Sequence, residues 1–408
     1  MKDTSATLTR LYYLDWLRVL AMLGIFFFHN ARFYDAWSDW HVRNATIDMG
    51  ASALTAFMGQ WIMPLFCLIA GGGTYYALKS RRAGQFLQER FLRLLVPLIF
   101  GMLVIVVPQA YYQALSHGVQ LGGYNVFQIY GLYLKTLLEH GWYQEWFHLW
   151  FLWYLFLYSL ISLPLFLIGS ASGKSIIYRL AVVFQKPWAL LVLFVFSIAA
   201  VNIFLYPGGY FGNRGQGGFN IVAYLLFFIF GYLIFANRRI MEGIKKMRWL
   251  MLGAAIVAIV GLVAFFVDEI ADPLAHFGTS RFALAHIVQS LNTWCWLLAI
   301  LGFGSRYLDR HNKILSYANQ AVLPFYILHQ TVIITIGYYV VQWNTGVGFK
   351  YLMISTTSFV AIMVIYELLV RRINVFRFLF GLKPQRKPPV HRMPEQWPFT
   401  SGPLVDIK

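Results

Sequence analysis

The chain has 408 residues, of which 59% are hydrophobic and only 12% are charged, and its mean hydropathy is +0.60. Soluble globular proteins carry about 25% charged residues, so this composition excludes an ordinary soluble domain. Apolar runs of about 20 residues, the length that an α-helix needs to cross a bilayer, recur along the chain. The formal net charge of +17 therefore bears on membrane orientation and is no sign of nucleic-acid binding.

Ten apolar segments predict an all-α, polytopic membrane protein with ten transmembrane helices. They fall at about residues 14–30, 51–78, 94–112, 148–169, 187–206, 219–236, 249–267, 282–303, 317–340 and 350–370. Residues 1–13 form a short polar N-terminus, and 14–370 form the membrane domain. The basic, Pro-rich tail over 371–408 is expected to be disordered.

The first apolar run and the cysteines limit the possibilities further. No small-residue cleavage site follows the first run, which contains Arg18, so we interpret it as a retained span and not as a signal peptide. The two cysteines, Cys67 and Cys295, both fall inside predicted spans. They provide neither a disulfide framework nor a metal-binding pair, and we expect no metal cofactor.

The basic residues alternate between the predicted connections. With the N-terminus in the cytoplasm, 27 of the 33 lysines and arginines fall on the cytoplasmic segments and 6 on the opposite side. A miscounted span would invert every later loop and destroy this alternation. The sequence therefore predicts about ten spans with both termini in the cytoplasm.

Two ionisable residues, Arg18 and His29, lie inside the first span. They are eleven residues apart, which corresponds to ~16 Å along a helix. Ionisable side chains are costly to hold inside a membrane, which makes both of them functional candidates. Two further arginines, Arg90 and Arg93, share the cytoplasmic depth of Arg18. Three further histidines share the outer depth of His29: His148, His286 and His329.

This polarity suits a phosphate-bearing reagent that arrives from the cytoplasm. The arginine side chain binds phosphate through a planar fork of donors. Histidine takes a proton from an acceptor hydroxyl or acts as the nucleophile itself. The reactive end of the reagent must reach ~15 Å into the membrane, and coenzyme A has a pantetheine arm of suitable length.

Each of these residues also has a structural interpretation. Asp15 and Arg18 are three residues apart and can pair at the start of a helix. Arg90 and Arg93 can anchor the cytoplasmic interface, as Arg18 can. The histidines can form hydrogen bonds between helices. The structural interpretation is weakest for His29.

The motifs and their order resemble the membrane acyltransferase 3 family. LDWLRVLAMLGIFFFH has the arginine, ten residues and histidine of that family's first helix, and ERFLRLLVP has its Arg-x-x-Arg pair. Three more segments resemble later motifs: MPLFCLIAGG, HLWFLWYL and SYANQAVLPFYILHQ. The resemblance covers about residues 12–370. The chain departs from the family pattern at Ala70, because the family usually has serine before the glycine that corresponds to Gly71.

Within the family, the N-terminal part is most similar to the glucans biosynthesis protein C branch, which succinylates periplasmic glucans. The segments that carry this similarity are YYLDWLR, FFFHNARFY and Trp40-His41-Val42. The similarity implies an O-acyltransferase of the bacterial inner membrane. Cytoplasmic acyl-CoA would donate an acetyl or succinyl group, and a hydroxyl of an extracytoplasmic glycan or a related molecule would accept it.

The resemblance also implies roles for individual residues. His29 and Arg18 are the catalytic candidates, and Arg18 joins Arg90 and Arg93 in holding the donor. Three residues have supporting roles: His329, His148 and Asp15. The sequence leaves open the acyl group, the acceptor, the oligomeric state and whether His29 acts as general base or acyl-carrying nucleophile.

Two other functions fit part of the sequence pattern. A polytopic transporter of an anionic solute would also place basic groups at one mouth of a helical bundle. Transporters often contain internal repeats, and none is evident between residues 14–169 and 219–370. A non-catalytic scaffold or sensor is disfavoured because the key arginine and histidine residues are all present.

Overall fold

A computed structural model describes residues 10–37, 40–140, 147–168, 182, 186–205 and 219–385. Within these ranges the regular secondary structure is entirely helical, so the all-α prediction is confirmed. Of the predicted disordered tail, residues 386–408 lie outside the described part. Its first part differs from the prediction, because Asn374–Leu379 form helix α18. The Phe380 ring at the end of α18 lies 5.4 Å from the Phe100 ring, and this apolar contact holds the helix in place.

Among the described residues, seven helical segments are long and apolar enough to cross a membrane. Four of them are single helices: Tyr12–Ala31 (α1), Arg238–Phe265 (α13), Ser280–Tyr307 (α15) and Lys313–Val340 (α16). The other three, Met49–Ser80, Phe147–Leu167 and Val347–Val370, each combine two helical elements. These elements are α2 (Met49–Gly59) with α3 (Ile62–Ser80), η3 (Phe147–Leu149) with α8 (Trp150–Leu167), and α17 (Val347–Ile365) with η6 (Tyr366–Val370). The structure thus shows multiple candidate spans, and the total of about ten stays a prediction.

Further helices complete the bundle. Ala83–Ile105 and Val107–Ser116 meet at 46° and make an eighth candidate if this bent pair is one span. The pair contains α4 (Ala83–Arg90), η1 (Phe91–Leu95), α5 (Val96–Phe100), η2 (Gly101–Ile105) and α6 (Val107–Ser116). The part of the chain that the structure describes also contains α7 (Ile129–His140), α10 (Pro187–Phe204), α12 (Ile221–Ala236) and α14 (Val267–Ala271). Helices α10 and α12 are apolar but shorter than the seven candidate spans.

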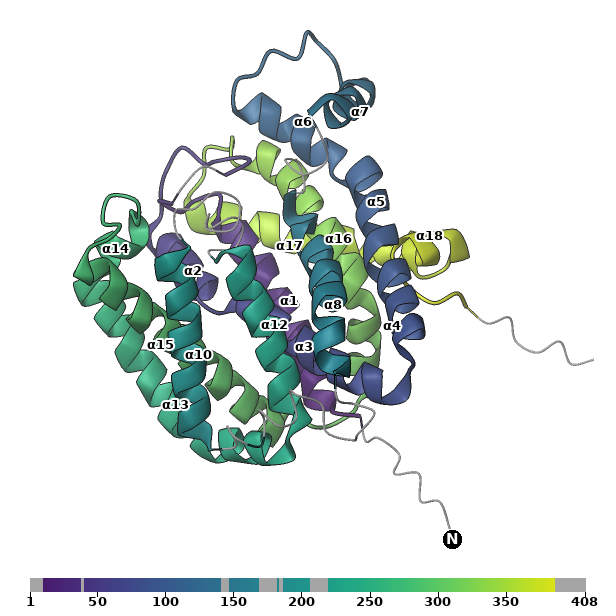
Figure 1. Cartoon of the computed structure of the whole chain (residues 1–408). Helices are drawn as coiled ribbons and strands as arrows, with labels where there is room; N and C mark the ends of the chain where they lie inside the picture. Colours follow the sequence, from purple (N-terminus) through teal and green to yellow (C-terminus); the bar gives the residue numbers. More distant parts are fainter. Residues whose placement is uncertain are drawn as a thin grey trace, which may run out of the picture.

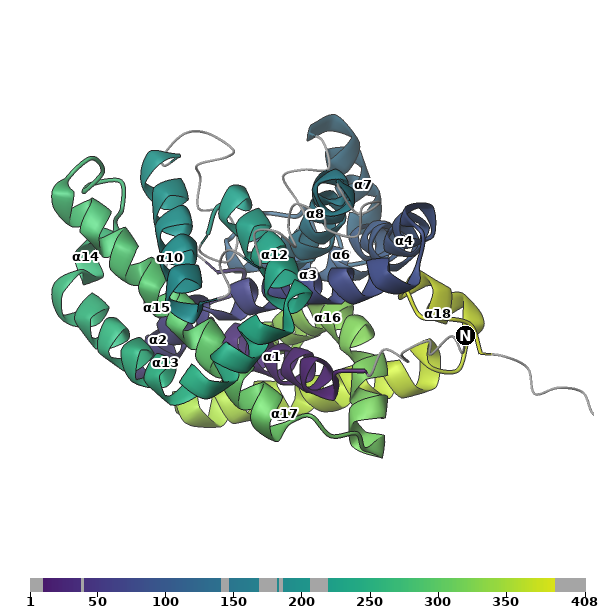
Figure 2. The ribbon, with the colours of Figure 1, turned by 60° about the horizontal axis from the view of Figure 1, so that its bottom comes forward.

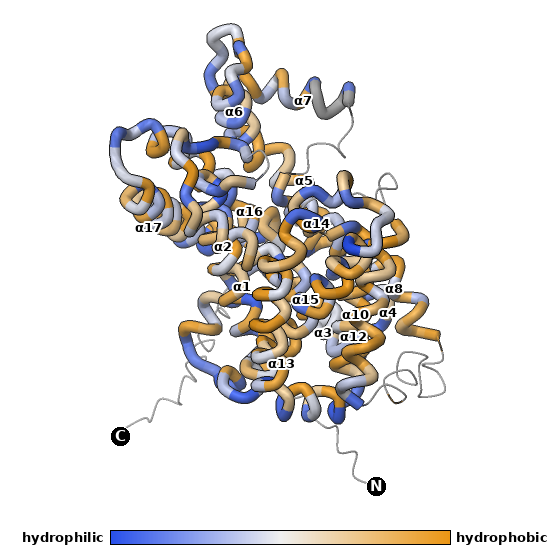
Figure 3. The backbone as a smooth tube through the Cα atoms, turned by 90° about the vertical axis from the view of Figure 1, so that its left-hand side faces the viewer, coloured by the Kyte–Doolittle hydropathy of each residue, from blue (hydrophilic) through white to orange (hydrophobic). Residues whose placement is uncertain are grey.

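Helix α1 lies inside the bundle and contacts α2, α3, α15, α16 and α17 (Figure 1). On one side, α13 packs along α15, and α10 packs against α15 (Figure 2). On the other side, α16 packs against α17 and α6. Helices α6 and α7 stand beyond one end of the bundle. In Figure 3, hydrophilic segments gather toward the two ends and apolar segments lie between them, as expected for a membrane protein.

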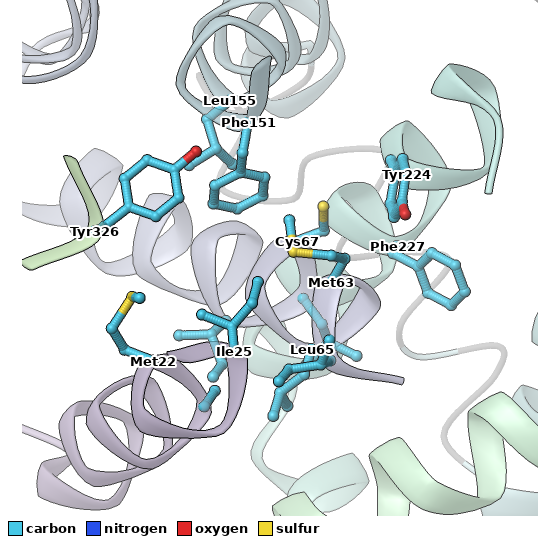
Figure 4. Close-up of a cluster of buried hydrophobic side chains, with 14 of the residues drawn as sticks. Met22, Ile25, Met63, Leu65, Cys67, Phe151, Leu155, Tyr224, Phe227 and Tyr326 are labelled. Carbon is cyan, nitrogen blue, oxygen red and sulfur yellow. The ribbon is translucent and has the colours of Figure 1, made fainter. Parts of the chain in front are cut away.

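The centre of the bundle is filled by apolar side chains from α1, α3, α8, α12 and α16 (Figure 4). Met22 and Ile25 of α1 belong to the same cluster as Met63 of α3, and Tyr326 of α16 lies near Phe151 of α8. Helix α1 is therefore packed along its length, which fixes the rotation of its polar residues.

Two glycines allow α3 and α12 to cross in backbone contact. A Cβ atom on Gly71 would lie 1.9 Å from the Phe228 carbonyl oxygen, and one on Gly231 would lie 2.1 Å from the Leu68 carbonyl oxygen. Small residues of this kind let membrane helices approach closely, where dispersion contacts stabilise their association. This crossing forms a fixed part of the scaffold around α1.

Candidate functional site

His29 lies in the last turn of α1, where the helix ends at Ala31. Its side chain is half-buried, and its Nδ1 atom is buried without a hydrogen-bond partner among the described residues. The ring centroid lies 5.2 Å from that of His329 on α16 and 5.2 Å from that of Trp40, on which it stacks at 14°. His29 is thus held by ring contacts, and its buried Nδ1 atom is not committed to a hydrogen bond among the described residues.

The other two histidines of the cluster are buried and fixed by backbone carbonyls. His329 Nδ1 lies 2.6 Å from the backbone carbonyl oxygen of Tyr326, and His148 Nε2 lies 3.1 Å from the backbone carbonyl oxygen of Ile327. Because a carbonyl only accepts, each of these nitrogens carries the proton in the tautomer that the contacts assign. The opposite nitrogens, Nε2 of His329 and Nδ1 of His148, are buried without a hydrogen-bond partner among the described residues. The two rings lie 5.1 Å apart.

The backbone before His148 adopts an unusual conformation. Phe147 has a φ of +44°, the only positive value of a non-glycine residue among the described residues. A bulky residue in the left-handed region costs on the order of 1–3 kcal/mol, and such strain clusters at functional sites. Here it turns the chain into α8 so that His148 enters the cluster. The Tyr326 hydroxyl, which donates to the His148 carbonyl oxygen, holds the turn against α16.

A fourth histidine, His41, lies in the connection between α1 and α2, beside the cluster. Its Nδ1 atom lies 2.5 Å from Gln113 Oε1, and its Nε2 atom lies 2.7 Å from Gln330 Nε2 and 3.1 Å from Gln109 Nε2. These partners fit a neutral ring that donates from Nδ1 and accepts at Nε2. Burial lowers the pKa of His41 to about 4, although the hydrogen bond to Gln113 acts in the opposite direction. His41 therefore positions this segment as a neutral group.

We expect His41 to make stability depend on pH. Its pKa of about 4 in the folded state lies below the ordinary 6.5. The contribution of neutral His41 to the free energy of unfolding is therefore fully present above pH 6.5 and is lost as the pH falls toward 4. Between pH 7.5 and pH 5 the loss is about 2 kcal/mol. In detergent, the wild type should lose more thermal stability over this range than His41→Gln, which retains a neutral amide. Equal losses in the two proteins would contradict this assignment.

Trp40 covers His29 and is itself held by charged residues. The Arg32 guanidinium lies 5.0 Å from the Trp40 ring centroid and forms a 2.7 Å ion pair with Asp35. Asp35 is fully buried, and Arg43 donates to its backbone oxygen at 2.5 Å. This connection between α1 and α2 therefore holds Trp40 against His29.

Arg18 lies near the N-terminal end of α1, away from His29. Its side chain is 37% exposed and lies 3.6 Å from Asp15 and 3.2 Å from Asn319 on α16. Asp15 also pairs with Arg10 at 2.7 Å. Asp15 thus pairs with Arg18 at the start of the helix, as expected from their spacing. The contact with Asn319 directs the guanidinium toward α16.

Arg90 and Arg93 lie at a π-helical turn. Arg90 ends α4, and Arg93 belongs to the turn η1, a type of distortion that is frequent at functional sites. Arg90 donates to Thr74 on α3 at 3.1 Å, while Arg93 is exposed. The charges of Arg18, Arg90 and Arg93 act on one another, so the three residues form a positive cluster at one end of the bundle.

The structure brings together most of the residues that the sequence singled out. His29, His148 and His329 form one cluster, and Arg18, Arg90 and Arg93 form the other. His286 joins neither cluster, although it was predicted at the same depth, because it lies on α15 and contacts Gln289 at 3.1 Å. Among the residues that the structure describes, no group of three or more His, Cys, Asp or Glu side chains is arranged to hold a metal ion.

Sequence reasoning did not assign roles to Trp40, His41 and the three glutamines that contact His41. In the sequence, Trp40 and His41 stand out only as part of a segment that carries the resemblance. The signal for Gln109 and Gln330 is their position inside apolar helices, where a buried amide requires a partner.

The candidate spans and the polar clusters at the two ends of α1 are features of a multi-pass membrane protein. The chain belongs to the membrane acyltransferase 3 family, whose acyltransferase domain model matches residues 11–368. It is similar to glucans biosynthesis protein C of Salmonella heidelberg (strain SL476), with 23% identity over 406 residues that cover 94% of this chain and 98% of the relative. It is 22% identical over 409 residues to the protein of the same name from Salmonella paratyphi B. No solved structure gives a significant match.

Proposed function

We propose that this protein is an O-acyltransferase that moves an acyl group from cytoplasmic acyl-CoA to a hydroxyl of an extracytoplasmic glycan. The observation that carries the proposal is the arrangement of α1, which holds His29 in a histidine cluster at one end and Arg18 in an arginine cluster at the other. The membership of the acyltransferase family supports the reaction type. The glucan named in the relatives' title supports the class of acceptor.

His29 is the reacting residue in this proposal. It is half-buried, whereas His148 and His329 are buried and already donate to backbone carbonyls. As a general base, His29 takes the proton of the acceptor hydroxyl while the oxygen attacks the thioester carbonyl. The carbon–sulfur bond then breaks, and the CoA thiolate leaves and takes up the proton. As a nucleophile, His29 carries the acyl group first and then passes it to the hydroxyl.

The arginine cluster holds the donor. Arg18, Arg90 and Arg93 supply guanidinium donors that match phosphate geometry. Asn319 and Thr74 orient two of these groups, and Asp15 positions Arg18. The spacing of ~16 Å along α1 suits the pantetheine arm, which would carry the thioester from the arginines to His29.

The proposed topology follows from this polarity. The arginine cluster and both termini face the cytoplasm, and the histidine cluster faces the outer side of a bacterial inner membrane. Ten spans satisfy the distribution of basic residues, with α10 and α12 counted as spans beside the longer helices. The membrane domain then covers residues 14–370.

The test of the proposed function is thioester cleavage by the purified protein in detergent. Acetyl-CoA and succinyl-CoA are offered in turn, each with and without a gluco-oligosaccharide, and free CoA is measured with a thiol reagent. We expect release with one donor and acylated sugar in the same sample. If neither donor is cleaved in the presence of sugar, and CoA does not raise the melting temperature, the proposal is wrong.

We expect Arg93→Ala to weaken donor binding. A charge-assisted hydrogen bond contributes about 1.5–3 kcal/mol, so the Kd for CoA should rise by roughly 10–100-fold. Arg93 is exposed and its removal leaves no buried partner, so the fold should persist. Arg82→Ala is the matched control, because Arg82 is an exposed arginine at the start of α4. Equal affinities in the two variants, measured by isothermal titration, would remove Arg93 from the donor site.

A further inference from the structure

A second feature lies away from the histidine cluster, between α1, α13 and α15. An open groove of about 370 Å³ runs there along the surface of the bundle. It is lined by Leu17, Leu252, Trp296, Ala299, Ile300, Phe303, Gly304, Tyr307 and Leu308. Its volume is in the range of small-molecule sites, and its wall is almost wholly apolar. A groove of this kind accepts a hydrocarbon chain.

Close packing of α15 against α1 and α13 and a pair of stacked aromatic rings shape the groove. Gly302 and Gly304 let α15 approach its neighbours, since a Cβ on Gly302 would lie 2.7 Å from the Arg248 Cβ and one on Gly304 would lie 2.9 Å from Leu17. Phe303 and Tyr307 stack at 6.2 Å between ring centroids. The two stacked rings form one side of the groove.

Positive charge lies at the same end of the bundle as the arginine cluster. The Arg248 guanidinium lies 6.0 Å from the Phe303 ring and 5.9 Å from the Tyr307 ring, and Arg306 lies 5.9 Å from Tyr307. Arg248 donates to the Lys245 carbonyl oxygen, but its Nε atom is buried without a hydrogen-bond partner. Within the described residues, neither arginine forms an ion pair with a carboxylate. The guanidiniums therefore retain donors for an external anion.

We propose that this groove is a binding site for an anionic phospholipid. One acyl chain lies along Trp296, Ile300 and Phe303, and the phosphate lies on Arg248 and Arg306. Basic pockets between helices at the cytoplasmic face bind anionic headgroups, and a phosphate forms strong hydrogen bonds to guanidinium. The charge of the site selects phosphatidylglycerol or cardiolipin over a zwitterionic lipid. This site is independent of the proposed acyl transfer.

The test is a titration of delipidated protein in neutral detergent with phosphatidylglycerol or phosphatidylcholine. The melting temperature reports binding, because a ligand that binds only the folded state raises it. We expect phosphatidylglycerol to give the larger rise. Arg248→Gln should lower the affinity for phosphatidylglycerol about fivefold, since one basic residue contributes about 1 kcal/mol to binding. The matched control is Arg238→Gln on the same helix, at a side chain that is 92% exposed, and it should bind as the wild type does.

Two further variants keep the test decisive if Arg248→Gln folds poorly. Arg306→Gln changes an exposed residue and should weaken phosphatidylglycerol in the same way. Ile300→Trp fills the groove and should weaken both lipids, because it removes the space for the acyl chain. Equal effects of the two lipids on the wild type, or unchanged binding in both the Arg306 and Ile300 variants, would overturn the proposal.

Discussion

Replacing His29 with alanine is expected to reduce acyl transfer by about 10²–10⁴-fold, the range typical of a lost general acid–base group. His29 is the accessible member of its cluster, and the rings of His148 and His329 are buried and fixed beside it. Neither can move into its place without giving up a hydrogen bond to a backbone carbonyl. The measurement is free CoA released per minute by purified protein with the donor that the wild type uses.

The same change should leave the fold intact. His29 Nδ1 has no hydrogen-bond partner to lose among the described residues, and the stacking contact with Trp40 contributes about 0.5–1.5 kcal/mol. His286→Ala is the matched control, because it removes a buried histidine that lies on α15 and contacts Gln289. His286→Ala should retain acyl transfer if it melts normally. Undiminished transfer by folded His29→Ala would exclude His29 as the reacting residue.

The spacing of residues along α1 was predictable from sequence, and the neighbours of α1 were not. A hydrophobic run determines the length of a helix and the depth of each residue within it, so Arg18 and His29 were placed correctly at opposite ends. The rotation of a helix and the identity of its neighbours depend on packing. Depth alone therefore could not separate His148 and His329, which join His29, from His286, which faces Gln289.

Features without a periodic pattern also escaped prediction. The segment Ala83–Ser116 contains an almost continuous apolar stretch, which hid two π-helical turns and the 46° bend after Ile105. His41 lies in a connection, where hydropathy carries no information about burial. Its role depends on three glutamines from α6 and α16 that only the folded chain brings together.

The crossing of α3 and α12 depends on Gly71, and we expect Gly71→Ala to disrupt folding. The added Cβ would lie 1.9 Å from the Phe228 carbonyl oxygen, which is backbone and cannot rotate away as a side chain can. Overpacking of ordinary core sites costs about 1–3 kcal/mol, and a backbone clash should reach or exceed the top of that range. The prediction is a large loss of folded protein in detergent, measured by size-exclusion chromatography and thermal melting.

Gly73→Ala on the same helix isolates this contact, because nothing lies within 4 Å of a Cβ added there. Alanine is favoured over glycine inside a helix by about 1 kcal/mol, so Gly73→Ala should be neutral or slightly stabilising. The same glycine-to-alanine change is thus expected to lower stability at position 71 and to leave it unchanged or raise it slightly at position 73. The comparison separates helix propensity from packing, since propensity alone favours alanine at both positions. If Gly71→Ala melts at or above the temperature of Gly73→Ala, then α3 and α12 do not cross in backbone contact.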